Sequence, residues 1–281
     1  MSMLRFAFNL ILLLAIVGAG LFYVYRGDRQ FLDRARINAT REAYSLMDRF
    51  GMTLPGTPDY DHLDARLAEK GVKIGDPVLV RIFKLDSELE LWMEKDGRYV
   101  KFATYPICRF SGRLGPKIRE GDNQAPEGFY TVAKEQLNPN SRWHRSFNLG
   151  YPNAFDRAHE RTGSLIMVHG GCLSVGCFAI TNAGVDEVWR LVTAALDKGQ
   201  PRFAVQVFPF RMTDANLAAR KGNRSAEFWT NLKTGYDLFE TTQLPPVVSL
   251  CDGAYAFEPG TAGAEVKPGE VKCPGALAEK P

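Results

Sequence analysis

The chain has 281 residues, of which 45% are hydrophobic, 11% aromatic and 24% charged. This composition excludes an intrinsically disordered chain, and 26 Gly with 16 Pro exclude a collagen-like one. The 35 Lys and Arg residues nearly balance 32 Asp and Glu, and the resulting net charge of +3 argues against a dedicated nucleic-acid-binding protein. Five Cys are too few for a small scaffold that depends on many disulfides.

The N-terminal segment contains an apolar stretch over residues 6–25, in which Asn9 is the only strongly polar residue. A helix of this length spans the core of a bilayer. Residues 10–17 also suit the apolar region of a signal peptide, and residues 17–19 offer a cleavage site. We therefore predict that residues 1–26 are a signal peptide or a membrane anchor and that the rest of the chain is exported. The alternative is a buried helix of a cytosolic protein.

Residues 27–76 are predicted to be a helical N-terminal region. A rough apolar stripe indicates a helix over residues 27–50. Residues 57–59 (Thr-Pro-Asp) are typical of a second helix start, with a capping hydroxyl, a proline at the first helical position and an acid in the first turn. Gly71 ends that helix.

Residues 77–212 are predicted to be mostly β and to form the main domain. Apolar or alternating runs indicate strands over residues 78–83, 87–93, 99–105, 128–132, 164–168 and 203–208. One amphipathic helix interrupts them, capped by Thr181 or Asn182 and ended by Gly199. The expected fold class is mainly β with flanking helices (α+β).

Two segments follow the main domain. Residues 213–250 carry helical signals, with Ser225 as a cap, and are predicted to be a helical extension. Residues 251–281 are rich in Gly and Pro and are predicted to be a flexible tail.

The most informative stretch is His169-Gly170-Gly171-Cys172-Leu173-Ser174-Val175-Gly176-Cys177, which lies between two predicted elements. A cysteine attacks as its thiolate, and a nearby imidazole can take its proton. His169 at a strand end and Cys177 at the start of the next element can face each other across a tight loop. This pattern predicts Cys177 as a nucleophile and His169 as its general base and acid.

The glycines and the serine of this loop have predicted supporting roles. Gly170 and Gly176 let the loop turn sharply and let a substrate approach the backbone. Backbone N–H groups at Gly176 and Cys177 could form an oxyanion hole for acyl transfer. Ser174 could bond to the site or stabilise the turn.

Two other interpretations of the loop stay open. In the first, it is a Gly-rich hairpin with a buried thiol and a histidine whose hydrogen bonds are satisfied. In the second, His169, Cys172 and Cys177 bind zinc, with His144 or His159 as a fourth ligand. No second paired motif supports the zinc site.

The loop resembles the active-site signature of the L,D-transpeptidase (YkuD-type) catalytic domain, and its closest match is the branch called YafK-like. The resemblance covers roughly residues 77–212. Its other segments are residues 115–117, 120–122, 125–130, 147–153 with Asp156, and 208–212.

The resemblance implies a β-rich sandwich or barrel with a helix packed against it. It implies that Cys177 attacks a peptide carbonyl at meso-diaminopimelate in a peptidoglycan stem peptide, and that His169 protonates the leaving amine. An amine acceptor then gives transpeptidation, and water gives hydrolysis. No metal or organic cofactor is needed. The expected location is the periplasm, either anchored in the inner membrane through residues 6–25 or released after signal cleavage.

The resemblance also implies where substrate binds. Tyr151 and Asn153 belong to the substrate-side loop, and Gly170 borders the reacting groups. Most family members carry an Arg two residues after the nucleophile, where this chain has Ala179. The candidates to replace that cation are Arg211, Lys117 and Arg145, and we take Arg211 as the predicted substrate contact.

Two departures from the family pattern open alternatives for function. The loop from His169 to Cys177 is short, which leaves the site more open. The YafK-like branch shares this feature and the missing Arg, and it is linked to cutting a diaminopimelate-anchored outer-membrane lipoprotein from peptidoglycan. A hydrolase with that role is the first alternative. A peptidoglycan-binding module that has lost catalysis is the second.

The remaining cysteines have several possible roles. Cys172 could be a resolving thiol that protects Cys177, or a small buried residue. Cys251 and Cys273 could form a disulfide in an oxidising compartment. Cys108 is most simply a small buried hydrophobic residue.

Overall fold

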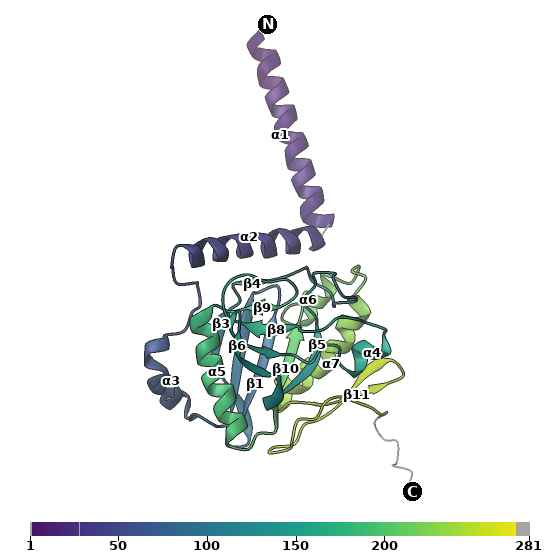
Figure 1. The fold of residues 1–281 in the computed structure, drawn as a ribbon. Coiled ribbons are helices and arrows are strands. Elements are labelled where there is room, and N and C mark those ends of the chain that lie inside the picture. Colours follow the sequence, from purple (N-terminus) through teal and green to yellow (C-terminus); the bar gives the residue numbers. More distant parts are fainter. Residues whose placement is uncertain (1, 28, 274–281) are drawn as a thin grey trace.

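Five strands of the predicted main domain form a sheet in the order β3-β2-β1-β10-β5 (Figure 1). The computed structural model describes residues 2–27 and 29–273. β1 is buried along its whole length and is apolar except for Arg81, so it takes a central place, parallel to β10 and antiparallel to β2. The strands are β1 (Val78–Phe83), β2 (Glu88–Lys95), β3 (Arg98–Pro106), β5 (Gly128–Ala133) and β10 (Arg202–Phe208).

A second five-stranded sheet, in the order β4-β9-β8-β7-β6, carries the loop from His169 to Cys177 between β8 and β9. Its strands are β4 (Arg109–Phe110), β6 (Leu137–Ser141), β7 (His144–Asn148), β8 (Met167–His169) and β9 (Phe178–Ala179). Side chains of the two sheets meet in one core, as where the rings of Phe147 and Phe203 lie 5.5 Å apart. The predicted α+β class is confirmed.

The amphipathic helix α5 (Asn182–Asp197) packs its apolar face against strands of both sheets. The side chain of Thr181 caps it, accepting a hydrogen bond from the N–H of Gly184. The predicted start at residues 57–59 is also present, but Asp59 rather than Thr57 provides the cap. The other helices that follow residue 50 are η1 (Tyr60–His62), α3 (Leu63–Lys70), η2 (Lys134–Gln136), α4 (Ala154–Ala158), α6 (Asp214–Ala218) and the longer α7 (Ala226–Thr242).

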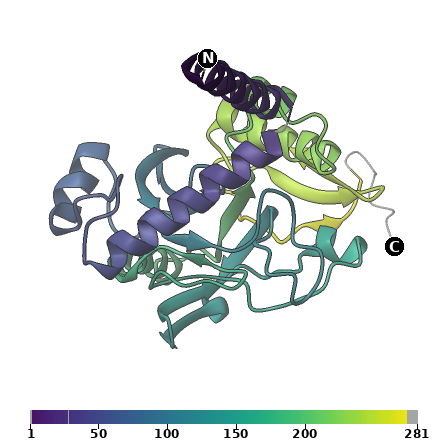
Figure 2. The ribbon, with the colours of Figure 1, turned by 90° about the horizontal axis from the view of Figure 1, so that it is seen from above.

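Two helices precede the sheets. α1 (Ser2–Gly27) projects away from the body, and α2 (Arg29–Arg49) lies across its top (Figures 1 and 2). In residues 2–27 and 29–273, no helix combines the length and the apolar character needed to cross a membrane. The signal peptide or anchor over residues 1–26 stays a prediction, and its first residue lies outside the described residues.

The C-terminal region contains a third sheet, in the order β12-β11-β13. The prediction of a flexible tail is wrong for residues 251–273, because strands form over residues 254–258 and 270–271 and the Gly and Pro residues lie in the connections around them. Tyr255 of this sheet is buried against α4, its ring stacked on that of Phe155 at 4.2 Å. The rest of the predicted tail, residues 274–281, lies outside the described residues. The strands are β11 (Val247–Cys251), β12 (Ala254–Glu258) and β13 (Glu270–Val271).

Candidate active site

Two short parallel strands carry the residues that the sequence predicts to react. His169 ends β8, and Cys177 immediately precedes β9. The register pairs Val168 with Phe178, so Cys177 falls level with Met167. Because alternate residues of a strand point to the same face, Cys177 and His169 lie on one face of the sheet.

His169 is held in one orientation and one tautomer. Its Nδ1 lies 2.6 Å from the carbonyl oxygen of Gly170, which can only accept, so Nδ1 carries the proton and Nε2 is left as a base. The indole of Trp143 stacks on the imidazole, with ring centroids 5.7 Å apart. Burial lowers the pKa of His169, against the opposing effect of the Gly170 bond, so the imidazole is neutral near pH 7.

Cys177 is a buried free thiol, and the other four cysteines are paired. Its sulfur accepts a hydrogen bond from the N–H of Met167 at 3.4 Å and donates to the carbonyl of Leu165 at 3.6 Å. Burial raises the pKa of the thiol, while the Met167 N–H and the charge of Lys117 oppose that rise. Within the described residues no hydrogen bond joins the sulfur to His169, as is common before a substrate binds.

The loop before Cys177 is fixed by hydroxyl groups and by a glycine. Ser174 donates from Oγ to the carbonyl of Cys177 at 2.6 Å, and Ser111 donates to the carbonyl of Ser174 at 2.8 Å. Gly176 has a φ of +98°, a conformation that favours glycine. Ser174 therefore supports the turn by bonding to the backbone of the nucleophile, and the oxyanion hole at Gly176 stays a prediction.

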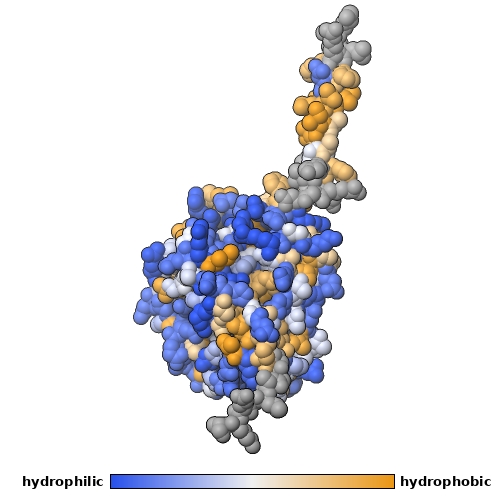
Figure 3. Space-filling view, turned by 90° about the vertical axis from the view of Figure 1, so that its right-hand side faces the viewer, coloured by the Kyte–Doolittle hydropathy of each residue, from blue (hydrophilic) through white to orange (hydrophobic). Residues whose placement is uncertain are grey.

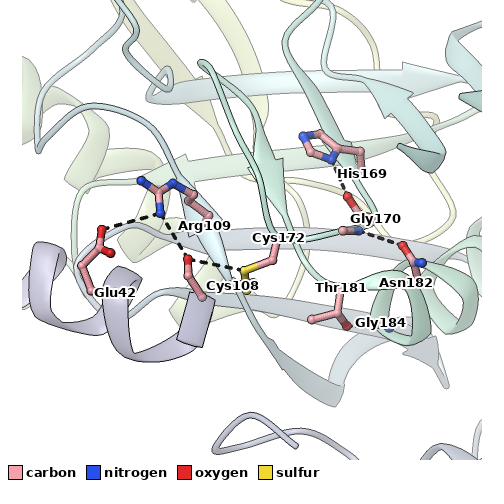
Figure 4. Close-up of a disulfide and its surroundings, with 11 residues drawn as sticks. Glu42, Cys108, Arg109, His169, Gly170, Cys172, Thr181, Asn182 and Gly184 are labelled. Carbon is pink, nitrogen blue, oxygen red and sulfur yellow. Dashed lines mark hydrogen bonds and ion pairs between the residues drawn. A yellow bond between two sulfur atoms is a disulfide. The ribbon is translucent and has the colours of Figure 1, made fainter. Parts of the chain in front are cut away.

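Gly170 is placed where only a hydrogen fits. A Cβ there would lie 2.7 Å from Oδ1 of Asn182 and 2.9 Å from the carbonyl oxygen of Trp143. The same Asn182 oxygen accepts a hydrogen bond from the N–H of Gly171 at 2.8 Å (Figure 4). Trp143 and Asn182 are thus site residues that the sequence did not reveal in this role, because nothing in the motif points to the hairpin or helix that carries them.

The predicted substrate residues of the loop over 147–153 have structural partners. The hydroxyl of Tyr151 donates to the carbonyl oxygens of Lys117 and Thr162. Asn153 caps α4, and its amide donates to the hydroxyl of Tyr255 at 2.7 Å. Tyr151 thus joins this loop to the segment that carries Lys117, whereas Asn153 holds the C-terminal sheet.

The predicted cation for substrate, Arg211, is occupied by carboxylates of β2. All three candidate cations are paired: Arg211 with Glu88 and Glu90, Lys117 with Asp122, and Arg145 with Asp186. Of the three, only Lys117 acts on the pKa of the nucleophile. Lys117 is therefore the better placed cation, and a substrate role for Arg211 stays a prediction.

Two interpretations of Cys172 are wrong, because its sulfur is bonded to that of Cys108. A sulfur that is bonded in a disulfide is not a free thiolate, so Cys172 cannot bind zinc beside His169 and Cys177 and cannot act as a resolving thiol. Cys108 is accordingly a disulfide partner rather than a plain hydrophobic residue. Cys251 and Cys273, whose pairing the sequence offered only as one possibility, also form a disulfide.

The disulfide of Cys108 with Cys172 lies between α2 and the loop over residues 170–177, which we call the catalytic loop (Figure 4). Ser45 of α2 is 3.7 Å from the sulfur of Cys172 and accepts a hydrogen bond from Arg109 at 3.1 Å. Arg109 also forms an ion pair with Glu42 of the same helix. The helix, the disulfide and the loop therefore form one connected unit behind the nucleophile.

Comparison with known proteins gives a clear relative. No family model matches the chain. The protein named "Putative L,D-transpeptidase YafK" of Escherichia coli (strain K12) is 46% identical over 195 residues, which cover 69% of this chain and 79% of the relative. The protein of the same name in Escherichia coli O157:H7 matches equally.

Solved structures give weaker likenesses. The helical cell shape determining protein Pgp2 from Campylobacter jejuni aligns with a TM-score of 0.40 and 22% identity, over 65% of this chain and 67% of that chain. Bd1075 of Bdellovibrio bacteriovorus aligns with a TM-score of 0.36 and 15% identity, over 62% and 76%.

Proposed function

The chain belongs to the L,D-transpeptidase family, and we propose that it is a cysteine acyltransferase that acts on peptidoglycan stem peptides at meso-diaminopimelate. The observation that carries this proposal is the buried free thiol of Cys177 on the same face as His169, whose Nδ1 is fixed by the Gly170 carbonyl. The reaction would take place in the periplasm, with residues 1–26 as signal peptide or inner-membrane anchor.

The proposed reaction has two halves. The Cys177 proton moves to Nε2 of His169 as the sulfur attacks the peptide carbonyl, and the amine then leaves with that proton. A thioester remains on Cys177. In the second half an amine, or water, gives its proton to His169 and attacks the thioester, which restores the thiol.

The charges of the site favour general-base catalysis over a preformed ion pair. Burial raises the pKa of Cys177 and lowers that of His169, so the resting pair is a thiol and a neutral imidazole. Proton transfer therefore accompanies attack, and the pair titrates as a unit. The positive charge of Lys117 would stabilise the developing thiolate.

Hydrolysis is the alternative outcome, and exposed side chains on the loop that precedes the buried thiol support it. Between the disulfide and the nucleophile, Leu173 and Val175 are 59% and 78% exposed, so no lid covers them in the described residues. A hydrolase of this kind would release lipoprotein linked to diaminopimelate.

The decisive experiment incubates the full chain with sacculi that carry diaminopimelate-linked lipoprotein and reads the products by mass spectrometry. Cys177→Ala is the inactive control, and circular dichroism checks that it folds. Lipoprotein release that depends on Cys177 would identify a hydrolase, whereas new cross-links or newly attached amines would identify a transpeptidase. Sacculus binding with neither product, and with no thioester adduct from a carbapenem, would contradict catalysis and leave the binding module.

A further inference from the structure

Three arginines from distant parts of the sequence line one cavity of about 240 Å³ beside the start of α2. Arg34 belongs to α2, Arg113 to the loop after β4, and Arg224 to the turn before α7. Burial, and then the charges of Arg224 and Arg34, lower the pKa of Arg113, as expected for cations that line the same cavity.

Among the described residues, no carboxylate forms an ion pair with this cluster. Within residues 2–27 and 29–273, none of the three guanidinium groups forms an ion pair or a side-chain hydrogen bond. Asp33 also lines the cavity, but both its oxygens bind Arg220, each at 2.7 Å. All three arginines are exposed, so water screens their mutual repulsion, and a bound anion would offset the part that remains.

The surrounding structure builds this arrangement. The ion pair of Asp33 with Arg220 is nearly buried and fastens α2 to the segment before α7, which brings Arg34 beside Arg224. The amide of Gln124 donates to the carbonyl of Arg113 and accepts from its N–H, which fixes the third segment. The three cations therefore converge because the fold holds their backbones.

The cluster continues toward the active site. A second cavity, of about 690 Å³, shares Arg113 and Arg224 with the first and extends past Arg119 to Gln124. The carbonyl of Gln124 lies 3.9 Å from where a Cβ of Gly176 would be, next to the nucleophile. Strongly hydrophilic side chains also gather on the upper part of the body, below α1 (Figure 3). The two adjoining cavities, with an excess of arginines in their lining, therefore extend from α2 to Gln124, whose backbone borders the loop that carries the nucleophile.

We propose that Arg34, Arg113 and Arg224 bind carboxylates of the peptidoglycan strand whose stem peptide reaches Cys177. The inference rests on the proposed function, since it identifies the polymer beyond the reacting bond. Stem peptides carry repeated carboxylates, and a guanidinium group binds a carboxylate through two parallel hydrogen bonds. The subsite replaces, at a distance, the cation that the chain lacks at Ala179.

The test compares two triple variants of the full chain for binding to protein-free sacculi. Arg34→Gln with Arg113→Gln and Arg224→Gln removes the cluster. Its control, Arg98→Gln with Arg190→Gln and Lys272→Gln, removes the same charge from exposed positions elsewhere. We expect the first variant to bind roughly tenfold more weakly and with a smaller salt dependence, and the control to bind like the wild type.

Further arms separate the possible failures. Carbapenem acylation of Cys177 should be equal in all three proteins, and its absence from the wild type would refute the proposed function rather than the subsite. Equal weakening in the control would overturn the subsite, as would unchanged binding of the wild type to sacculi with amidated carboxylates. If the variant without the cluster lost binding to phosphatidylglycerol vesicles but bound sacculi like the wild type, the cluster would be assigned to lipid headgroups and the proposal would be overturned.

Discussion

The two disulfides of this protein differ little in what they should add to stability and greatly in what they hold. Cys108 and Cys172 are 64 residues apart, and Cys251 and Cys273 are 22 apart. Loop-closure entropy gives about 4 kcal/mol for the first and about 3 kcal/mol for the second. The difference between the two regions therefore lies in their contacts.

The first disulfide, between Cys108 and Cys172, is attached to the loop that precedes the nucleophile. Cys172 is buried, lies five residues before Cys177, and packs with Cys108 against Leu54. The second bridge joins half-exposed ends of the C-terminal sheet, which contacts α4 and α7. A covalent link should affect catalysis only where it limits the positions of the reacting groups, and this distinction can be tested.

The largest effect is expected from Gly170→Ala, which disturbs the catalytic region directly. The new Cβ would meet Asn182 Oδ1 at 2.7 Å and the Trp143 carbonyl at 2.9 Å, and a backbone carbonyl cannot move away cheaply. The carbonyl of residue 170, which accepts the hydrogen bond from Nδ1 of His169, would shift and move the imidazole. A displacement of a reacting group by about 1 Å lowers turnover roughly a hundredfold. Steady-state kinetics on muropeptides measures this loss.

Gly253→Ala is the matched control in the C-terminal region. Gly253 has a φ of +76° and no atom within 4 Å of an added Cβ, so the change costs roughly 1 kcal/mol of backbone strain. Thermal unfolding should show that loss while turnover stays unchanged. A similar fall in turnover for both variants would contradict the assignment of Gly170 to the site.

The second effect concerns pH. Catalysis needs a neutral His169, and burial lowers its pKa, so the acid limb of kcat/KM should lie below the pH at which an exposed histidine titrates. Below that limb, activity should fall about tenfold for each pH unit. Trp143→Ala uncovers the ring and should move the limb to higher pH, whereas His144→Gln, at a histidine paired with Asp186, should not. An unmoved limb in Trp143→Ala would show that the indole does not control burial of the base.

The same contrast between regions explains what the sequence could predict. Strands of the central sheet and α5 have strong, regular apolar patterns, and the structure confirms them. The strand β6 reads Leu-Asn-Pro-Asn-Ser and is mostly exposed, so no apolar pattern reveals it. In β12 the alternation over residues 254–258 is short, and the Gly and Pro around it resemble a disordered tail.

The candidate site divides in a similar way. His169, Ser174 and Cys177 stand in one short motif, so the sequence indicates that they belong to one site, and the pairing of β8 with β9 puts His169 and Cys177 on one face. Trp143 and Asn182 reach the site from a hairpin and a helix, which only tertiary structure makes neighbours. A charge such as that of Arg211 does not indicate which carboxylates it will meet.

The third effect is expected from Cys108→Ser combined with Cys172→Ser. Opening this bridge frees the loop before Cys177 from the segment between β3 and β4. We expect a fall in turnover of roughly fivefold to tenfold together with a lower Tm. The carbapenem adduct should still form, because the thiol and the base remain. Unchanged turnover at a lower Tm would show that the bridge stabilises the fold without positioning the nucleophile.

The smallest effect on turnover is expected from Cys251→Ser combined with Cys273→Ser. The loop-entropy estimate gives this bridge about 3 kcal/mol, so Tm should fall nearly as much as for the first pair. Turnover should stay within about twofold of the wild type, since Tyr255 and Asn153 still hold the sheet to α4 through their hydrogen bond. Equal losses of stability with unequal losses of turnover would establish that attachment to the catalytic loop, rather than the number of residues enclosed, determines what each disulfide does. Equal losses of both would mean that the C-terminal sheet also positions the site, through α4 and the loop over residues 147–153.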